Sequence, residues 1–180
     1  KAIHKDENIL DKSASGGVFS AIVNSFCKDD FVVFGVEFDE NNNAVHSYTE
    51  TIKGTEKYRK SKYIQSNINN SYKIAERFLK EEKNVLFTGT TCQIAGLRLY
   101  LRIDYENLFL VDIVCHGVPS QKVFDDYKNC LQNKYKDEVK SYSFRHKTHT
   151  NHKDWNSRNI TFIINDKIIV KNSYKDEYLK

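Results

Sequence analysis

Apolar residues in the first part of the chain recur at helical spacing and then give way to short apolar runs. One apolar stripe consists of Val18, Phe19, Ile22, Val23 and Phe26. Ser13 or Ser15 precedes the stripe as a candidate cap, so we predict a helix that runs to about Lys28. The next run, FVVFGVEF at 31–38, is dense in β-branched and aromatic residues and predicts a strand. A turn-rich DENNNA tract and a short run at 45–48 then predict a hairpin.

The middle of the chain alternates between buried-type strands and amphipathic helices. The pattern predicts, in order, a helix at about 71–82, a strand at 84–89, a helix at 93–101, a strand at 107–115 and a helix after Ser120. Alternation of this kind is typical of parallel strands joined by right-handed crossovers. We therefore expect an α/β fold.

The last third of the chain changes character. SYSFRHK at 141–147 is a candidate strand, THTNHKDWNSRN at 148–159 is a polar loop, and ITFII-ND-KIIV at 160–170 is a candidate hairpin. We expect this antiparallel element to close the edge of the sheet. The predicted fold class is α/β, with a mixed, largely parallel sheet flanked by helices and an antiparallel hairpin near the C-terminus.

Length and charge narrow the class of protein. By length, residues 1–180 are expected to form a single α/β domain. The 28 basic and 24 acidic side chains alternate along the chain, so we expect no nucleic-acid binding. Neither a membrane-spanning run nor the apolar segment of a signal peptide is present, so we expect a cytoplasmic protein. The chain starts without methionine, and we expect it to be a fragment of a longer protein.

The cysteines and histidines do not predict a metal site. The four cysteines are widely spaced and form no C-x-x-C, so neither a zinc site nor an iron–sulfur cluster can be built from local sequence. His146, His149 and His152 lie three residues apart, but in a polar tract without a carboxylate or cysteine at matching spacing. Cys27 and Cys130 lie on or beside apolar helix stripes and are predicted to be core residues.

The first candidate site is the corner FTGTTCQ, where a strand turns into a helix. Ligands of open α/β sheets bind beyond the carboxyl ends of parallel strands. Here Gly89 lets the backbone turn, and two threonine hydroxyls and the first helix amides face outward, beside the thiol of Cys92. A plain capped turn with a buried cysteine explains these residues equally well.

The second candidate site follows the next strand. Cys115 and His116 precede Gly117, and Pro119 or Ser120 opens a helix. Adjacent residues of an extended segment point to opposite faces, so Cys115 and His116 are poor dyad partners. A dyad of Cys92 with His116 across the strands stays open, as does a structural role for His116.

Two further segments carry residues that suit a cofactor. Residues 13–17, SASGG, resemble a small phosphate cradle at a helix start, although such starts are common. The loop at 58–66, YRKSKYIQS, offers cations, an aromatic surface and amides, and can be a solvated loop or a loop that covers a cofactor.

Four tracts stand out by their order and separation: SASGGVFSAI, RKSKYIQSNI, VLFTGTTCQIAGLR and VDIVCHGVPSQKVF. Together they resemble the coenzyme F420 hydrogenase/dehydrogenase beta-subunit family. The resemblance implies a flavoprotein that binds FAD on an α/β domain and passes electrons between iron–sulfur clusters or ferredoxin and a deazaflavin-type or other acceptor. Members commonly carry a cysteine-rich ferredoxin-like segment, so the clusters are expected in the full-length protein and not in this chain.

The resemblance also implies a set of site residues. The catalytic candidates are Cys92, Cys115 and His116. The residues expected around FAD are Ser15, Gly16, Gly17, Lys62, Tyr63, Gln65, Ser66, Thr88, Gly89, Thr90, Thr91, Gln93 and Gly117. At the position of Thr91 the family usually has proline, which predicts a looser turn in this chain.

Three interpretations of function follow. The first is an FAD-dependent oxidoreductase domain that works with a ferredoxin-like domain or protein, and self-association of the chain is compatible with it. The alternative is a non-catalytic binding or assembly module in polysaccharide biosynthesis, where relatives of this family often occur. The last is a cysteine-dependent transferase built on Cys92 and His116, for which no orienting acid is evident.

Overall fold

The computed structural model describes residues 2–146, 159–172 and 175–178. By its internal contacts the chain divides into two compact units. One unit, which we call the parallel-sheet unit, comprises Phe19–Tyr58 and Ser66–Val118. The other, the antiparallel-sheet unit, comprises Lys1–Val18, Arg59–Gln65 and Pro119–Lys180. The single domain over 1–180 stays a prediction.

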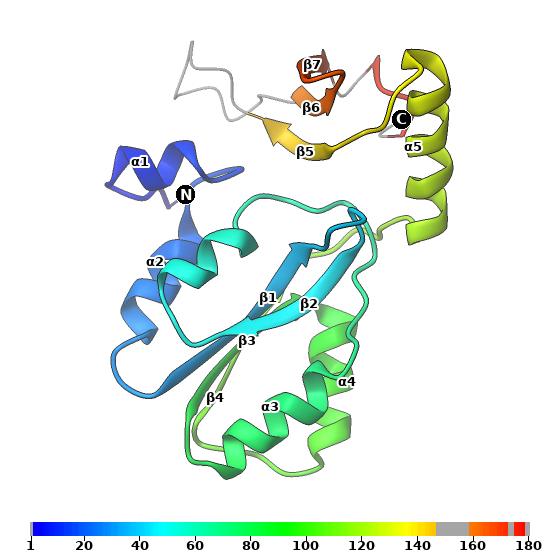
Figure 1. Ribbon diagram of the computed structural model, residues 1–180. Helices are drawn as coiled ribbons and strands as arrows, with labels where there is room; N and C mark the ends of the chain where they lie inside the picture. Colours follow the sequence, from blue (N-terminus) through cyan, green and yellow to red (C-terminus); the bar gives the residue numbers. More distant parts are fainter. Residues whose placement is uncertain (1, 147–158, 173–174, 179–180) are drawn as a thin grey trace. The chain divides into compact units, whose positions relative to one another are not determined.

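The parallel-sheet unit is built on four strands in the order β2-β1-β3-β4 (Figure 1). The strands are β1 (Phe31–Phe38), β2 (Ala44–Thr49), β3 (Asn84–Thr90) and β4 (Leu108–Ile113). β1 and β2 pair as an antiparallel hairpin, whereas β3 runs parallel to both β1 and β4. The predicted hairpin and the predicted parallel strands are both confirmed.

Helices cover both faces of this sheet (Figure 1). The helices α3 (Ser71–Lys80) and α4 (Thr91–Leu101) pack on one face, and α2 (Val18–Phe26) and the 3-10 helix η1 (Lys53–Tyr58) pack on the other. Successive strand residues point to opposite faces. Phe34 and Phe87 are therefore buried against α3 and α4, whereas the neighbouring Val33 and Leu86 are buried against α2 and η1.

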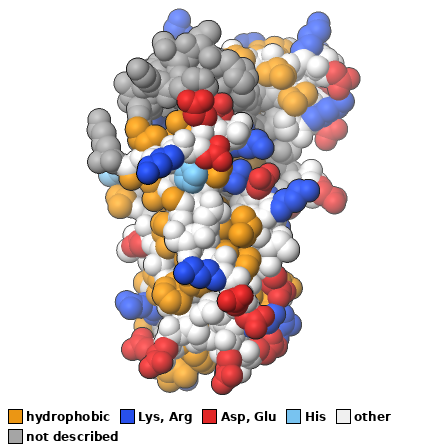
Figure 2. Space-filling view, turned by 90° about the vertical axis from the view of Figure 1, so that its left-hand side faces the viewer, with side chains coloured by type: hydrophobic (Ala, Val, Ile, Leu, Met, Phe, Trp, Pro, Cys, Tyr) orange, Lys and Arg blue, Asp and Glu red, His pale blue; other side chains and the backbone are white. Residues whose placement is uncertain are grey.

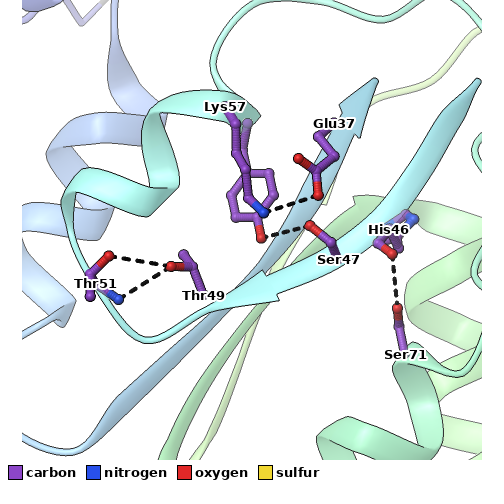
Figure 3. A network of polar contacts seen from close by, with 8 residues as sticks. Glu37, His46, Ser47, Thr49, Thr51, Lys57 and Ser71 are labelled. Atoms are coloured by element: carbon purple, nitrogen blue, oxygen red, sulfur yellow. Dashed lines mark hydrogen bonds and ion pairs between the residues drawn. The ribbon is translucent and has the colours of Figure 1, made fainter. Parts of the chain in front are cut away.

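The helix η1 is fixed on the hairpin by polar and aromatic contacts (Figure 3). Lys57 Nζ lies 3.0 Å from Glu37 Oε1, and Ser47 Oγ lies 2.9 Å from the hydroxyl of Tyr58. A Cβ on Gly35 would lie 2.5 Å from the Tyr58 ring, so the glycine makes room for that ring. The polar segment after β2, which has no clear period in the sequence, thus has a defined place on the sheet.

The antiparallel-sheet unit contains α1 (Glu7–Asp11), α5 (Gln121–Tyr135) and a sheet of order β5-β6-β7. Its strands are β5 (Ser141–His146), β6 (Asn159–Ile164) and β7 (Lys167–Asn172). Asn165 and Asp166 both have positive φ, +51° and +53°, as a two-residue type I′ turn requires. The predicted hairpin is confirmed, but its predicted place at the edge of the parallel sheet is wrong, because the hairpin pairs with β5 in a sheet of its own.

Aromatic side chains form the core of this second unit. The cluster comprises Phe124, Tyr127, Tyr142, Phe144, Phe162 and Tyr178. The Tyr127 hydroxyl donates a hydrogen bond to the buried carboxylate of Asp176, and Lys171 Nζ lies 3.6 Å from the same carboxylate. The hydroxyl donor and the ammonium compensate a charge that has no exposure to water.

Some local predictions were wrong at the residue level. Ser13 does not cap α2, because its hydroxyl donates to the Ile9 carbonyl at 2.7 Å, and α2 begins later, at Val18. Cys27 is buried as predicted, and burial raises the pKa of its thiol to about 11. Cys130 is exposed, contrary to prediction. The buried face of α5 follows Phe124 and its helical neighbours instead, since the larger aromatic side chain buries more apolar surface.

The predicted polar loop and the absence of a membrane-spanning run can be considered only for the residues that the structure describes. The predicted polar loop lies outside the described residues, with His149, His152 and most of its other members. Within the residues that the structure describes, no helix is both long enough and apolar enough to cross a membrane.

Candidate functional site

The strongest candidate site is the corner at which β3 ends and α4 begins. β3 is buried over most of its length, and burial ends at Thr90, the residue that caps α4. Thr90 has the extended backbone of an N-cap, with φ −74° and ψ 160°. Gln93 Oε1 accepts a hydrogen bond from the Thr90 amide at 3.0 Å, as in a capping box. The predicted turn with a threonine cap is present.

The inner side of this corner is a chain of buried and half-buried polar groups. Gln93 Nε2 donates to Ser66 Oγ at 2.9 Å, and Ser66 Oγ lies 3.1 Å from His46 Nδ1. His46 Nε2 in turn lies 3.2 Å from the carbonyl oxygen of Thr88. The structure therefore brings together Ser66, Thr88, Thr90 and Gln93, four of the residues that the resemblance places around FAD, and adds a residue that is not among them.

The missed residue is His46, which lies on β2 (Figure 3). Its side chain is 4% exposed and its ring stacks on Phe87, with ring centroids 5.5 Å apart. Burial lowers the pKa of His46 to about 4, and the hydrogen bond to Thr88 opposes this shift only in part. Strand periodicity could have flagged it, because His46 shares the inward face of β2 with the buried Ala44.

Neighbouring side chains fix His46 and Gln93 from behind. Ser71 Oγ donates to the main-chain carbonyl of His46 at 3.4 Å (Figure 3). The Tyr72 hydroxyl donates to the main-chain carbonyl of Gln93 at 2.7 Å. Burial, with a smaller contribution from Cys92, raises the pKa of Tyr72, so this donor keeps its proton. Both contacts come from the start of α3, which links the helix layer to the corner.

Gly89 lies inside this group of side chains. A Cβ on Gly89 would come 3.3 Å from Gln93 Cβ and Oε1 and 3.6 Å from His46 Nε2. Gly89 does not have a positive φ, so its backbone conformation does not itself require glycine. The glycine is therefore explained by the protein's own side chains, and direct approach of a ligand to Gly89 stays a prediction.

The outer side of the corner is open to solvent. Thr91 and Cys92 are exposed. The Thr91 hydroxyl donates to Asp112 Oδ1 of β4 at 3.0 Å, and Thr90 Oγ1 lies 3.2 Å from Cys92 Sγ. The amides of Thr91 and Cys92 have no acceptor within the helix, because they precede its first hydrogen-bonded turn. The outer face therefore combines free amide donors with one exposed carboxylate.

The end of β4 is the second predicted element of the site. β4 pairs in parallel register with β3, with Thr90 opposite Ile113, so both strands end at the same edge of the sheet. Cys115, His116 and Gly117 follow and are exposed. Gly117 donates its amide to Cys115 Sγ at 3.3 Å and has φ +103°. The described partner of Cys92 is Thr90, so a dyad of Cys92 with His116 stays a prediction.

The remaining predicted residues belong to the antiparallel-sheet unit. The Gly16 carbonyl accepts a hydrogen bond from the His4 amide at 2.7 Å, and a Cβ on Gly17 would lie 3.0 Å from His4 Cβ. Gly17 also has φ +74°. These glycines, beside the exposed Ser15, thus let the N-terminal segment approach. A cofactor role for Ser15, Gly16 and Gly17 stays a prediction.

The loop at 59–65 has contacts within the same second unit. Lys62 Nζ donates to the Arg59 carbonyl at 2.8 Å. The Tyr63 carbonyl accepts from the Tyr178 hydroxyl at 2.8 Å, and the Tyr63 ring meets Phe144 edge-on. Gln65 is exposed and donates its amide to the Pro119 carbonyl at 3.0 Å. The loop is therefore ordered by the protein itself, and its role over a cofactor stays a prediction.

Charges of both signs are mixed on the visible surface. On the face shown in Figure 2, lysine and arginine side chains alternate with aspartate and glutamate among the residues that are drawn in colour. Among the coloured residues of this face, the lysine and arginine side chains do not form a continuous basic stripe of the kind typical of nucleic-acid interfaces.

The sequence of the region that contains the corner matches a known protein family. The family model for the C terminus of the coenzyme F420 hydrogenase/dehydrogenase beta subunit matches residues 82–174, which is more than half of the 180 residues. The chain belongs to this beta-subunit family. The match contains β3, the corner, β4 and the segment after it, whereas His46 and Ser66 lie outside it. The family is one of hydrogenase and dehydrogenase subunits.

A solved structure shares the fold of this beta-subunit family member. It is a chain of the F420-reducing [NiFe] hydrogenase complex from Methanosarcina barkeri, with a TM-score of 0.58 and 18% sequence identity. The similarity covers 94% of this chain and 58% of that chain, so the protein spans little more than half of that chain's length. No curated protein sequence matches the chain.

Proposed function

We propose that this chain is the FAD-binding part of an oxidoreductase, which passes electrons between iron–sulfur clusters or ferredoxin and a deazaflavin-type or other acceptor. The observation that carries the proposal is the exposed amino terminus of α4 at the carboxyl end of β3, inside the region that matches the beta-subunit family. In open α/β sheets this is the edge at which nucleotides bind.

The residues of the corner suit the nucleotide part of FAD. The first amides of α4 and the positive end of its dipole favour a phosphate. Asp112 lies on the neighbouring strand β4 and already accepts a hydrogen bond from Thr91. Its carboxylate can also accept hydrogen bonds from ribose hydroxyls. A carboxylate repels a phosphate, so we assign the phosphate to Cys92 and the amides of the helix, and the ribose to Asp112. FAD, when bound, would supply the step between two-electron and one-electron transfer.

Cys92, Cys115 and His116 remain the candidates for the redox end of the site. All three are exposed at the edge where β3 and β4 end, which is the placement that contact with a partner or a second cofactor requires. We propose a ferredoxin-like domain or protein as the electron partner, in keeping with the hydrogenase complex that contains the solved relative. The alternative, an assembly module in polysaccharide biosynthesis, gains no support from the family match.

A flavin titration tests the proposal. FAD added to the purified chain should bind, and binding should quench the fluorescence of the flavin and raise the unfolding temperature of the protein. A free ligand concentration of about 100 times Kd stabilises a folded protein by about 2.7 kcal/mol. Asp112→Ala should weaken binding about tenfold without loss of stability, since Asp112 is exposed.

The matched control is Asp104→Ala. Asp104 is also an exposed acid, but it lies ahead of β4 and hence beyond the opposite end of that strand. This variant should bind FAD as the wild type does. If saturating FAD leaves the unfolding temperature of the wild-type chain unchanged, the proposed function is wrong.

A further inference from the structure

A continuous hydrogen-bond chain runs behind the β3–α4 corner, from the Thr88 carbonyl through His46, Ser66 and Gln93 to the Thr90 amide. Its four distances are 3.2, 3.1, 2.9 and 3.0 Å. The described hydrogen bonds of the three side chains connect them to one another and to the backbone of β3 and its end. They lie on the inner side of the backbone that carries the exposed residues.

The ends of this chain fix the direction of every hydrogen bond in it. A carbonyl oxygen can only accept, so His46 Nε2 carries the proton that faces Thr88. Burial keeps the ring neutral, which makes Nδ1 an acceptor and Ser66 Oγ its donor. Ser66 Oγ then accepts from Gln93 Nε2, and Gln93 Oε1 accepts from the Thr90 amide. One arrangement of protons therefore satisfies all groups.

The hydrogen-bond chain begins and ends on the two residues that flank Gly89. It starts at the carbonyl of Thr88 and returns at the amide of Thr90, and a Cβ on Gly89 would come 3.3 Å from Gln93 and 3.6 Å from His46 Nε2. Three side chains thus close a ring around one glycine peptide. Such a ring restrains the backbone at the point where the strand becomes the helix.

Ser66, the middle side chain of this hydrogen-bond chain, is held in place by the backbone of the residue that follows it. Asn67, the residue after Ser66, donates its amide to the Ala44 carbonyl at 2.8 Å and accepts from the His46 amide at 2.8 Å. The position of Ser66 is therefore set by β2, the strand that also carries His46. Ser66 is also the residue at which the loop at 59–65 rejoins the parallel-sheet unit.

We propose that His46 is a positioning residue for the cofactor site, which acts through Ser66 and Gln93 to hold the Thr88–Thr90 backbone and hence the amino terminus of α4. This inference rests on the proposed function for its ligand. It adds His46 to the site and gives Ser66, which the resemblance already placed near FAD, a supporting role; both residues lie outside the region that matches the family.

Hydrogen exchange and flavin binding test the inference separately. The variants are His46→Phe, which keeps a ring to stack on Phe87 but removes both hydrogen bonds, and Ser66→Ala. Each should raise the native-state exchange rate of the Thr90 amide about tenfold or more, because its restraint is lost. Each should also weaken FAD binding by about tenfold, the effect of about one well-placed hydrogen bond.

Two further variants separate positioning from general stability. Thr55→Val removes a buried hydroxyl of η1 that donates to the Ile52 carbonyl at 2.6 Å and takes no part in the hydrogen bonds from Thr88 to Thr90. It should lower stability but leave both the Thr90 exchange rate, relative to global unfolding, and the FAD affinity unchanged. Ser66→Thr retains the hydroxyl and should restore both readouts.

The outcomes are distinct. If Thr90 exchange is no faster in His46→Phe and Ser66→Ala than in Thr55→Val, the positioning role is wrong. If exchange accelerates but the FAD affinity of these variants equals that of the wild type, the link from His46 to the cofactor site is wrong. If the wild type binds no FAD while Thr90 exchange depends on His46 and Ser66, the proposed function fails and the restraint on the corner is supported.

Discussion

The ends of β3 and β4 lie side by side in one sheet but are built in opposite ways. At the end of β3, side chains from β2, α3 and α4 surround the backbone, and His46 is 4% exposed. At the end of β4, Val114 is 85% exposed, and a Gly117 Cβ would have no heavy atom of the described residues within 4 Å apart from its chain neighbours. The first end is supported from inside the protein, and the second is not.

This difference separates two tasks that one site can need. A supported backbone presents amides in a fixed geometry without reorganisation, which suits a constant ligand such as a cofactor. An open end with an exposed thiol and imidazole has room to adjust, which suits a partner that arrives and leaves. The comparison therefore predicts that substitutions at the two ends change different properties.

The largest effect is expected from the two glycines. Gly89→Val places methyl groups where Gln93 and His46 pack, and should lower the free energy of unfolding by about 3 kcal/mol as well as weaken FAD binding. Gly117→Ala meets no neighbour among the described residues, so its cost should be only the strain of a side chain at φ +103°, about 1 kcal/mol. Urea unfolding of both variants measures the difference.

The order of the two glycine effects is the decisive result. A larger loss of stability in Gly117→Ala than in Gly89→Val would show that the end of β4 is the better supported one, contrary to the structure.

The second prediction uses the titration of His46. Its pKa is about 4 in the folded state against 6.5 as the ordinary value, so the unfolded chain binds more protons between these pH values. The stabilisation is complete above about pH 6.5 and is lost as the pH falls toward about 4, by about 3 kcal/mol in all. His46→Phe should abolish this part of the pH dependence of urea unfolding.

The control is Thr55→Val, which removes no titratable group. It should lower stability but keep the wild-type pH profile. An unchanged profile in His46→Phe would mean that His46 does not stay neutral and buried in solution, and the ordered hydrogen-bond chain behind the corner would be wrong.

The sequence predicted the fold where local signals and packing agree. The strand at 31–38, the Asn165–Asp166 turn and the threonine cap at Thr90 all follow from side-chain chemistry that acts within a few residues. The hairpin near the C-terminus was predicted correctly but assigned to the wrong sheet. Strand pairing between distant segments is decided by tertiary packing, which periodicity does not encode.

The candidate site likewise contains residues that are adjacent in the sequence and residues that only the tertiary fold brings together. Thr88 to Gln93 could be selected from the sequence because glycine, hydroxyls and a helix start are adjacent in the chain. His46 could not be assigned to them, since 42 residues separate it from Thr88 and only the β2-β1-β3 order and the loop to Ser66 bring them together. Asp112 was missed for the same reason, because its hydrogen bond to Thr91 joins neighbouring strands.

The smallest effect is expected at Thr91, the first residue of α4. Proline is favourable at this helix position, and Thr90 already has the extended backbone that a residue before proline requires. Thr91→Pro loses the hydrogen bond to Asp112 but restrains the unfolded chain, so the free energy of unfolding should change by less than about 1 kcal/mol. This expectation replaces the looser turn that the sequence suggested for Thr91.

The same substitution sharpens the assignment of the phosphate to the helix amides. Proline has no amide hydrogen, so Thr91→Pro should leave FAD binding within about threefold only if the amide of Cys92 and those after it bind the phosphate. Thr91→Ala keeps the amide and removes only the hydroxyl that Asp112 accepts. Loss of FAD binding in Thr91→Pro with normal binding in Thr91→Ala would show that the amide of Thr91 binds the phosphate. The phosphate would then contact the residue next to Thr90, whose amide is held by Gln93.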